Sequence, residues 1–98
     1  MNIFLPNIED PSIEHFDTLL QTDKLKIEKI TSHGQTSSEW YDQDSDEWVV
    51  LLEGEATLLF EEDREIPLIK GEYIFIASGV RHKVIYTSSP TIWLAIHF

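Results

Sequence analysis

The stretch from residue 71 to residue 82 reads Gly71-Glu-Tyr-Ile-Phe-Ile-Ala-Ser-Gly79-Val-Arg-His82, and it predicts an apolar strand followed by a glycine turn. A second apolar stretch, Glu47-Trp-Val-Val-Leu-Leu-Glu-Gly54, precedes it. Each stretch places one potential metal ligand or proton-transfer group, Glu47 or His82, at the mouth of an apolar strand. We therefore expect the chemistry of this chain to centre on these two side chains.

Outward from these stretches, the chain alternates between short apolar runs and turn residues. Strands are predicted over residues 25–30, 48–52, 56–60, 65–69, 73–76, 82–86 and 91–98. Including the N-terminus, roughly eight short strands at about 8–12-residue spacing indicate an all-β antiparallel sandwich or barrel. Closing the strands into a barrel leaves a mouth that can hold one small ligand or ion.

The first 24 residues show a different pattern. Residues 1–8 predict a short strand that Pro6 interrupts. Asp10-Pro11 is typical of a helix N-cap followed by a proline in the first turn. Apolar residues then follow at helical spacing: Ile13, Phe16, Leu19 and Leu20. We therefore expect a short amphipathic helix over residues 11–20, ahead of the barrel, within one domain that spans residues 1–98.

The composition excludes several classes of partner. The chain has 98 residues, with 18 acidic against 7 basic, and a net charge of -11. Such a surface repels nucleic acid and anionic lipid, so we expect neither as a partner. The chain has no cysteine, which excludes disulfides, thiolate metal sites and a cysteine nucleophile. The N-terminus lacks the features of a signal peptide, and we expect a cytoplasmic protein.

The two stretches resemble the two motifs of the cupin superfamily, in particular small single-domain cupins of bacteria. The first motif is glycine, a His-x-His pair, three or four residues, glutamate, six residues and glycine, and Glu47-x6-Gly54 matches its second half. The spacing Gly71-x5-Ala77-x-Gly79-x2-His82 matches the second motif, with Tyr86 at its asparagine position. The resemblance covers residues 25–98 and implies a double-stranded antiparallel β-barrel, the jelly roll.

The metal site that the resemblance implies is reduced in this chain. The family's usual site has three imidazoles and one carboxylate, whereas only Glu47 and His82 match ligand positions here. The run Trp40-Tyr-Asp-Gln43 stands where the His-x-His pair would lie, as in some small cupins. We expect Gln43 or Tyr41 and waters to complete the shell of a divalent cation. An oxygen-rich shell with one imidazole favours manganese or ferrous iron, and zinc is a further option.

Strand alternation extends this site to a ligand pocket. Side chains alternate across a strand, so an inward Glu47 places Val49 and Leu51 on the same interior face. If residues 87–91 close a hairpin with the preceding strand, His97 falls roughly opposite His82; in one register it faces the interior, and in the other it lies on the exterior. The predicted pocket is apolar with a few polar groups, as small-molecule sites usually are. Its expected lining is Val49, Leu51, Tyr86, Trp93 and His97.

Three hypotheses follow for the function, and the sequence leaves open whether the protein is an enzyme. The first is a metal-binding cupin that uses Glu47 and His82. The second is a metal-free module or sensor for a small molecule, which the missing histidine pair favours. The third is an acid–base isomerase with the same two residues as the proton-transfer pair. We also expect a homodimer, because an exposed face of Trp48, Val50 and Leu52 would form a large apolar patch.

Overall fold

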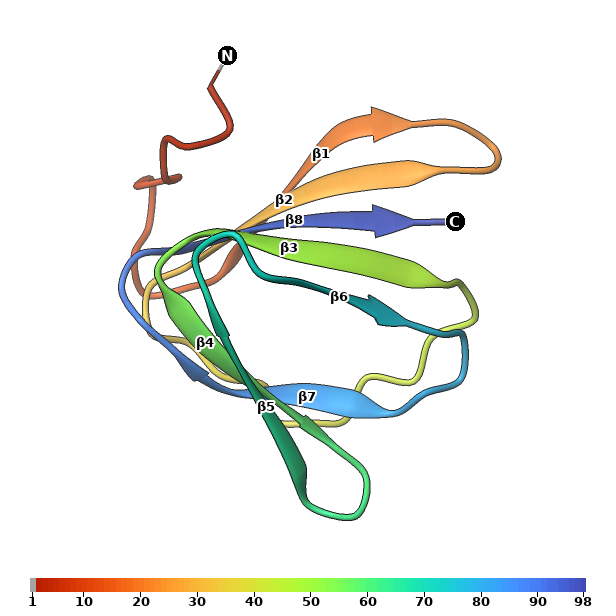
Figure 1. Cartoon of the computed structure of the whole chain (residues 1–98). Helices are drawn as coiled ribbons and strands as arrows, with labels where there is room; N and C mark the ends of the chain where they lie inside the picture. The colour runs from red at the N-terminus through yellow and green to blue at the C-terminus, as the bar shows by residue number, and fades with distance from the viewer. Residues whose placement is uncertain (1) are drawn as a thin grey trace.

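The computed structural model describes residues 2–98 and consists of eight antiparallel strands in two sheets (Figure 1). The larger sheet has the strand order β1-β2-β8-β3-β6, and the smaller has the order β5-β4-β7. The strands are β1 (His15–Gln21), β2 (Lys26–Ser32), β3 (Glu47–Glu53), β4 (Glu55–Phe60), β5 (Arg64–Ile69), β6 (Tyr73–Ile76), β7 (His82–Thr87) and β8 (Thr91–His97). The predicted all-β architecture of two antiparallel sheets is confirmed.

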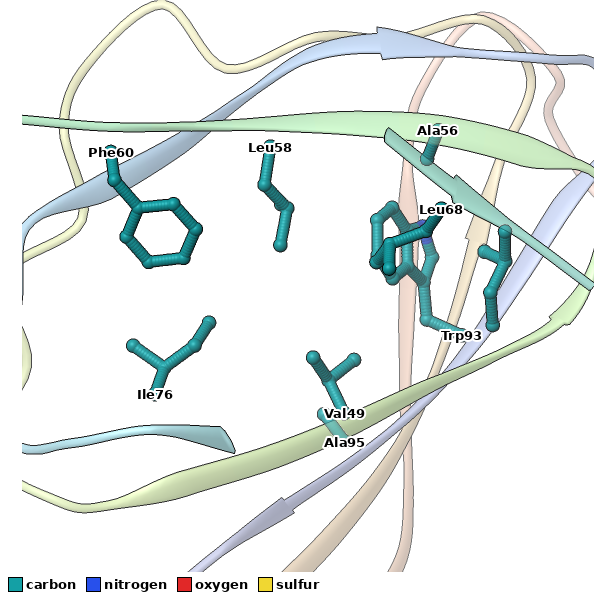
Figure 2. Packing of buried hydrophobic residues seen from close by; sticks show 9 residues of the cluster. Val49, Ala56, Leu58, Phe60, Leu68, Ile76, Trp93 and Ala95 are labelled. Atoms are coloured by element: carbon teal, nitrogen blue, oxygen red, sulfur yellow. The ribbon is translucent and has the colours of Figure 1, made fainter. Parts of the chain in front are cut away.

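The two sheets enclose an apolar core that follows from the period-two pattern (Figure 2). In the larger sheet, Val49 of β3 lies opposite Ala95 of β8, and both point inward. In the smaller sheet, Leu58 of β4 is buried from the other side. The buried cluster consists of Val49, Leu51, Ala56, Leu58, Phe60, Leu68, Ile76, Trp93 and Ala95.

The strand directions bring the two sequence motifs to one end of the molecule. β3 begins at Glu47 and β7 begins at His82, while β8 ends at His97 next to the C-terminus (Figure 1). Glu47 is the direct cross-strand partner of His97, with Ile76 of β6 on its other side. The fold therefore gathers these polar residues where the sheets end rather than in the middle of the core.

The predicted helix over residues 11–20 is wrong. Residues 15–21 instead form β1, an edge strand that pairs with β2. Within residues 2–98, no helix is long and apolar enough to cross a membrane. Asp10 accepts hydrogen bonds from the backbone and hydroxyl of Ser12, so it stabilises a turn instead of capping a helix. Within β1, a register shift leaves Leu19 without a partner, so the apolar residues of the strand depart from a period of two, and Ile13 lies before the strand.

The strand predicted for residues 1–8 is also absent from the part that the structure describes, and Met1 lies outside it. Leu5 and Asn7 of this segment instead contact β1 and β2 through hydrogen bonds that involve side chains. The Nδ2 of Asn7 donates to Asp17 Oδ2 at 3.2 Å, and the Nζ of Lys29 donates to the carbonyl of Leu5. Pro6 has no amide hydrogen for a strand ladder, which agrees with this irregular path.

Candidate functional site

A cavity of about 190 Å³ lies between the sheets at the end where the two motifs meet. Its apolar lining comes from both sheets and includes Val49, Leu58, Ile76 and Val84. Three aromatic side chains also line it: Phe16, Tyr41 and Trp93. The polar lining consists of Glu14, Glu28, Gln43, Glu47, His82 and His97. An apolar cavity with a few convergent polar groups is the usual form of a small-molecule site.

Glu47 is the centre of the polar group. It is the first residue of β3, and only 8% of its surface is exposed. The Nε2 of Gln43 donates a hydrogen bond to Glu47 Oε1 at 2.9 Å. Two imidazoles flank the same carboxylate, with His82 Nε2 at 3.7 Å from Oε1 and His97 Nε2 at 3.9 Å from Oε2. The carboxylate is thus fixed by an amide and faced by two ionisable rings.

His82 is held in one orientation by its neighbours. Its ring lies between those of Tyr41 and Phe60, at centroid distances of 5.6 and 5.9 Å. Its Nδ1 lies 3.0 Å from the carbonyl oxygen of Val80, and a carbonyl can only accept, so Nδ1 carries a proton. Nε2 is therefore the atom that faces Glu47 and the cavity, beyond hydrogen-bond distance of that carboxylate.

His97 brings a second carboxylate into the site. Its Nε2 lies 3.7 Å from Glu28 Oε1, and Glu28 Oε2 lies 3.2 Å from the Nζ of Lys26. Glu28 was not singled out by the sequence reasoning. Glu28 is an acidic residue at an inward position of β2. Acidic side chains are rarely buried without a partner, so this position could have indicated a site residue. The pairing of β2 with β8 places it diagonal to His97, which only the topology reveals.

Glu14 is a third cavity carboxylate that the sequence reasoning missed. It precedes β1, and its Oε2 accepts a hydrogen bond from the hydroxyl of Ser32. Burial raises the pKa of Glu14 above its ordinary value of 4.5, and the Ser32 hydrogen bond opposes that shift. The folded state therefore penalises the ionised form of this side chain.

The raised pKa of Glu14 predicts that the effect of Glu14→Gln on thermal stability depends on pH. A carboxyl group whose pKa is raised by folding imposes no penalty below its unfolded pKa and the full penalty above its folded pKa. The melting temperature of Glu14→Gln minus that of the wild type should therefore be more positive at pH 7 than at pH 4. Thermal unfolding at both pH values measures the difference. Glu65→Gln, an exposed change on β5, controls for the loss of one negative charge; an equal trend in that variant would contradict the assignment.

Two residues expected in the pocket do not line the cavity. Leu51 is fully buried in the core, and Tyr86 is exposed. A register shift in the pairing of β4 with β7 leaves Ile85 without a partner, so Tyr86 shares the outer side with its partner Thr57. The cavity does include seven of the predicted site residues: Tyr41, Gln43, Glu47, Val49, His82, Trp93 and His97.

Apart from one tyrosine, the ionisable side chains that line the cavity are three glutamates and two histidines. No lysine or arginine lines the cavity. Arg81 lies 3.5 Å from Glu61 and over the ring of Trp40, and Lys83 lies over the same ring. Within residues 2–98, no three or more histidine, aspartate or glutamate side chains are arranged as a metal-binding group. The geometry therefore suits a ligand that is held by carboxylates and imidazoles.

Comparisons with known proteins identify relatives of this chain. The family model described as the cupin domain matches residues 27–97. A solved structure from Ralstonia eutropha JMP134, named "putative mannose-6-phosphate isomerase", is 37% identical with a TM-score of 0.90, covering 99% of this chain and 94% of that chain. A cupin superfamily protein from Desulfitobacterium hafniense DCB-2 shares the fold at 20% identity and a TM-score of 0.80, covering 91% of this chain and 80% of its own. No curated protein matches the chain.

Proposed function

Because the chain belongs to the cupin domain family, we propose that its cavity binds a small organic molecule without a metal, with Glu47 as the central anchor. The observation that carries this proposal is the Glu47 carboxylate itself. It is almost fully buried, is fixed by Gln43, and faces a largely apolar cavity together with His82 and His97. A buried carboxylate in such surroundings orients a ligand through directional hydrogen bonds.

Each part of the cavity has a role in this proposal. Glu47 accepts hydrogen bonds from hydroxyl or N–H groups of the ligand, and His82 Nε2 offers a second polar contact. Val49, Ile76 and Trp93 pack against the apolar part of the ligand. The cavity of about 190 Å³ lies below the roughly 300–1,000 Å³ of pockets for drug-sized ligands. The ligand is therefore expected to have only a few non-hydrogen atoms.

A thermal-shift screen of small polar compounds tests this function. The screen is run with a chelator, so that adventitious metal does not contribute. A ligand at about 100 times its dissociation constant stabilises a protein by roughly 2.7 kcal/mol, which is a shift of many degrees for a domain of this size. The shift should vanish in Glu47→Gln and persist in Glu65→Gln. A hit whose shift survives Glu47→Gln, or a screen without hits, would contradict the proposal.

The second candidate function is a divalent metal ion held by Glu47 and His82. It is favoured by the tautomer of His82, since metal-binding histidines usually donate their other ring N–H to a carbonyl or carboxylate. The 3.7 Å between Glu47 Oε1 and His82 Nε2 is a separation that two ligands of one ion can have at roughly 2.0–2.2 Å each. Gln43 or Tyr41 and waters would complete the shell of manganese, iron or zinc, which would act as a Lewis acid.

Elemental analysis by plasma mass spectrometry tests the metal site directly. Tag-free protein, purified without chelating resin, should then contain near-stoichiometric metal that is lost in His82→Ala. Metal content that does not respond to this substitution, or to Glu47→Gln, would rule out the site. Because the readout is bound metal, the result is independent of any assumed activity.

The name of the Ralstonia protein suggests isomerase chemistry as a further candidate, and the residues that line the cavity restrict which substrate this chain could bind. Glu47 and His82 could form the proton-transfer pair of an acid–base isomerase. A sugar phosphate, however, carries a dianion that requires basic side chains, and the cavity lining contains three glutamates and no lysine or arginine. We therefore propose that the ligand of this chain is not phosphorylated.

We also propose that the chain forms a homodimer through the outer face of the larger sheet. Tyr73 and Phe75 of β6 are 66% and 54% exposed. Their cross-strand partners on β3 are Val50 and Trp48, which are partly exposed on the same face. Contiguous exposed apolar surface of this kind is uncommon on monomers. Light scattering should show a dimer that Phe75→Glu disrupts; a wild-type monomer would exclude this interface.

A further inference from the structure

We propose that the ligand of the cavity is a small organic ammonium ion with an apolar body. This inference rests on the proposed small-molecule function and specifies the ligand class. It starts from the charges of the lining: three carboxylates, those of Glu14, Glu28 and Glu47, face the cavity. The only side chains of the lining that can carry a positive charge are the imidazoles of His82 and His97.

Glu28 and Glu47 bound the same end of the cavity. They lie 3.7 and 3.9 Å from one atom, His97 Nε2, although they come from different strands. Both residues are at least nine-tenths buried. Burying a carboxylate is costly unless a positive group or hydrogen bonds compensate it. Lys26 contacts Glu28 from the adjacent open groove, whereas among the described residues Glu47 has one hydrogen bond, from Gln43, and no lysine or arginine partner. A positive group within the cavity would supply this compensation.

The aromatic rings of the lining and the Nε2 of His82 point to the same ligand independently. Phe16, Tyr41 and Trp93 present aromatic rings to the cavity, and organic cations bind favourably over such rings. The side chain of His82 is only 6% exposed, and its Nε2 faces the cavity without a hydrogen bond from the described residues. That atom can accept a hydrogen bond from an N–H of the ligand.

The remaining walls of the cavity specify the body of the ligand. Val49, Leu58, Ile76 and Val84 form an apolar surface drawn from both sheets. An alkyl group next to the ammonium group would bury against these side chains and gain the usual hydrophobic stabilisation. An anionic head group would instead meet three carboxylates with no arginine or lysine in the lining. The site therefore discriminates by the charge of the head group.

Three ligands of nearly equal size test this discrimination: n-butylammonium, 1-butanol and butyrate. Binding is measured by calorimetry and thermal shift at matched ionic strength with a chelator present. Only n-butylammonium should bind and stabilise the protein. Its dissociation constant should rise about tenfold in Glu28→Gln, because one carboxylate close to the head group is neutralised. It should change less than twofold in Glu65→Gln, which removes the same charge from an exposed strand position.

The outcomes separate this inference from the proposed function. Equal stabilisation by 1-butanol, or preferential binding of butyrate, would overturn ammonium recognition. So would n-butylammonium binding that is unaffected by Glu28→Gln. If none of the three binds while another compound stabilises the protein through Glu47, the ligand class is wrong and the small-molecule function stands. Stabilisation by manganese chloride alone, without chelator, would overturn both in favour of the metal site.

Discussion

Replacing Leu51 with alanine is expected to lower the free energy of unfolding by about 2–5 kcal/mol. Leu51 lies in the middle of β3, has no exposed surface, and is the cross-strand partner of the buried Trp93. Its side chain belongs to the cluster that joins the inner faces of the two sheets. The substitution removes buried methyl groups and leaves a void that close-packed neighbours fill only in part. Urea unfolding followed by tryptophan fluorescence measures the loss.

A matched leucine-to-alanine substitution at an exposed strand position distinguishes the loss of core packing from the loss of a leucine in a strand. Leu20→Ala makes the same chemical change in β1, where the side chain is 49% exposed, and should cost less than about 1 kcal/mol. Leu51→Ala should also leave the dissociation constant of a cavity ligand nearly unchanged in folded protein, because Leu51 does not line the cavity. Similar costs for the two variants would contradict the assignment of Leu51 to the core.

Most of the fold could be predicted from the sequence because apolar runs separated by turn residues mark most of its strands. Seven of the eight strands lie where the period-two pattern and the glycine turns indicated them. Glu47 and His82 begin the strands that follow from their motif positions, and they face one another in the cavity. Local alternation fixes such positions because a side chain at every second residue of a regular strand points to the same face.

Two of the errors occur where a register shift interrupts that alternation. Leu19 is left without a partner between Thr18 and Leu20, so the apolar residues of β1 depart from a period of two. The register shift at Ile85 turns Tyr86 to the outside of β7 in the same way. A single sequence has no clear signal for these bulges, because an unpaired residue is defined by the neighbouring strand.

The positions of His97 and Glu28 in the site depend on pairings between strands that are distant in the sequence. His97 had two possible orientations, and the pairing of β8 with β3 places it opposite Glu47. Glu28 joins the site because β2 pairs with the other edge of β8. Polar residues of four strands, β2, β3, β7 and β8, therefore meet at one cavity, and the motif spacing specified only those of β3 and β7.

Two of the four crossings between the sheets meet at Gly54, and this contact predicts the second large effect on stability. β3 of the larger sheet runs directly into β4 of the smaller sheet (Figure 1). Gly54 links the two strands with a φ of 86°. The chain from β7 back to β8 packs directly against its Cα. A Cβ at this position would lie 2.5 Å from Ser88 Oγ, 2.8 Å from the carbonyl oxygen of Pro90 and 3.0 Å from Thr91 Oγ1.

Gly54→Ala should therefore lower the free energy of unfolding by about 2–5 kcal/mol, combining left-handed backbone strain with overpacking. Gly71→Ala separates the two causes, because Gly71 has a φ of 89° but no atom within 4 Å of a Cβ. The free energy of unfolding of Gly71→Ala should fall by only roughly 1–2 kcal/mol, the cost of left-handed backbone strain alone. Urea unfolding of both proteins measures the difference. Equal losses would mean that the crossing segments move apart at no cost, so that the contact at Gly54 does not help hold the two sheets around the cavity.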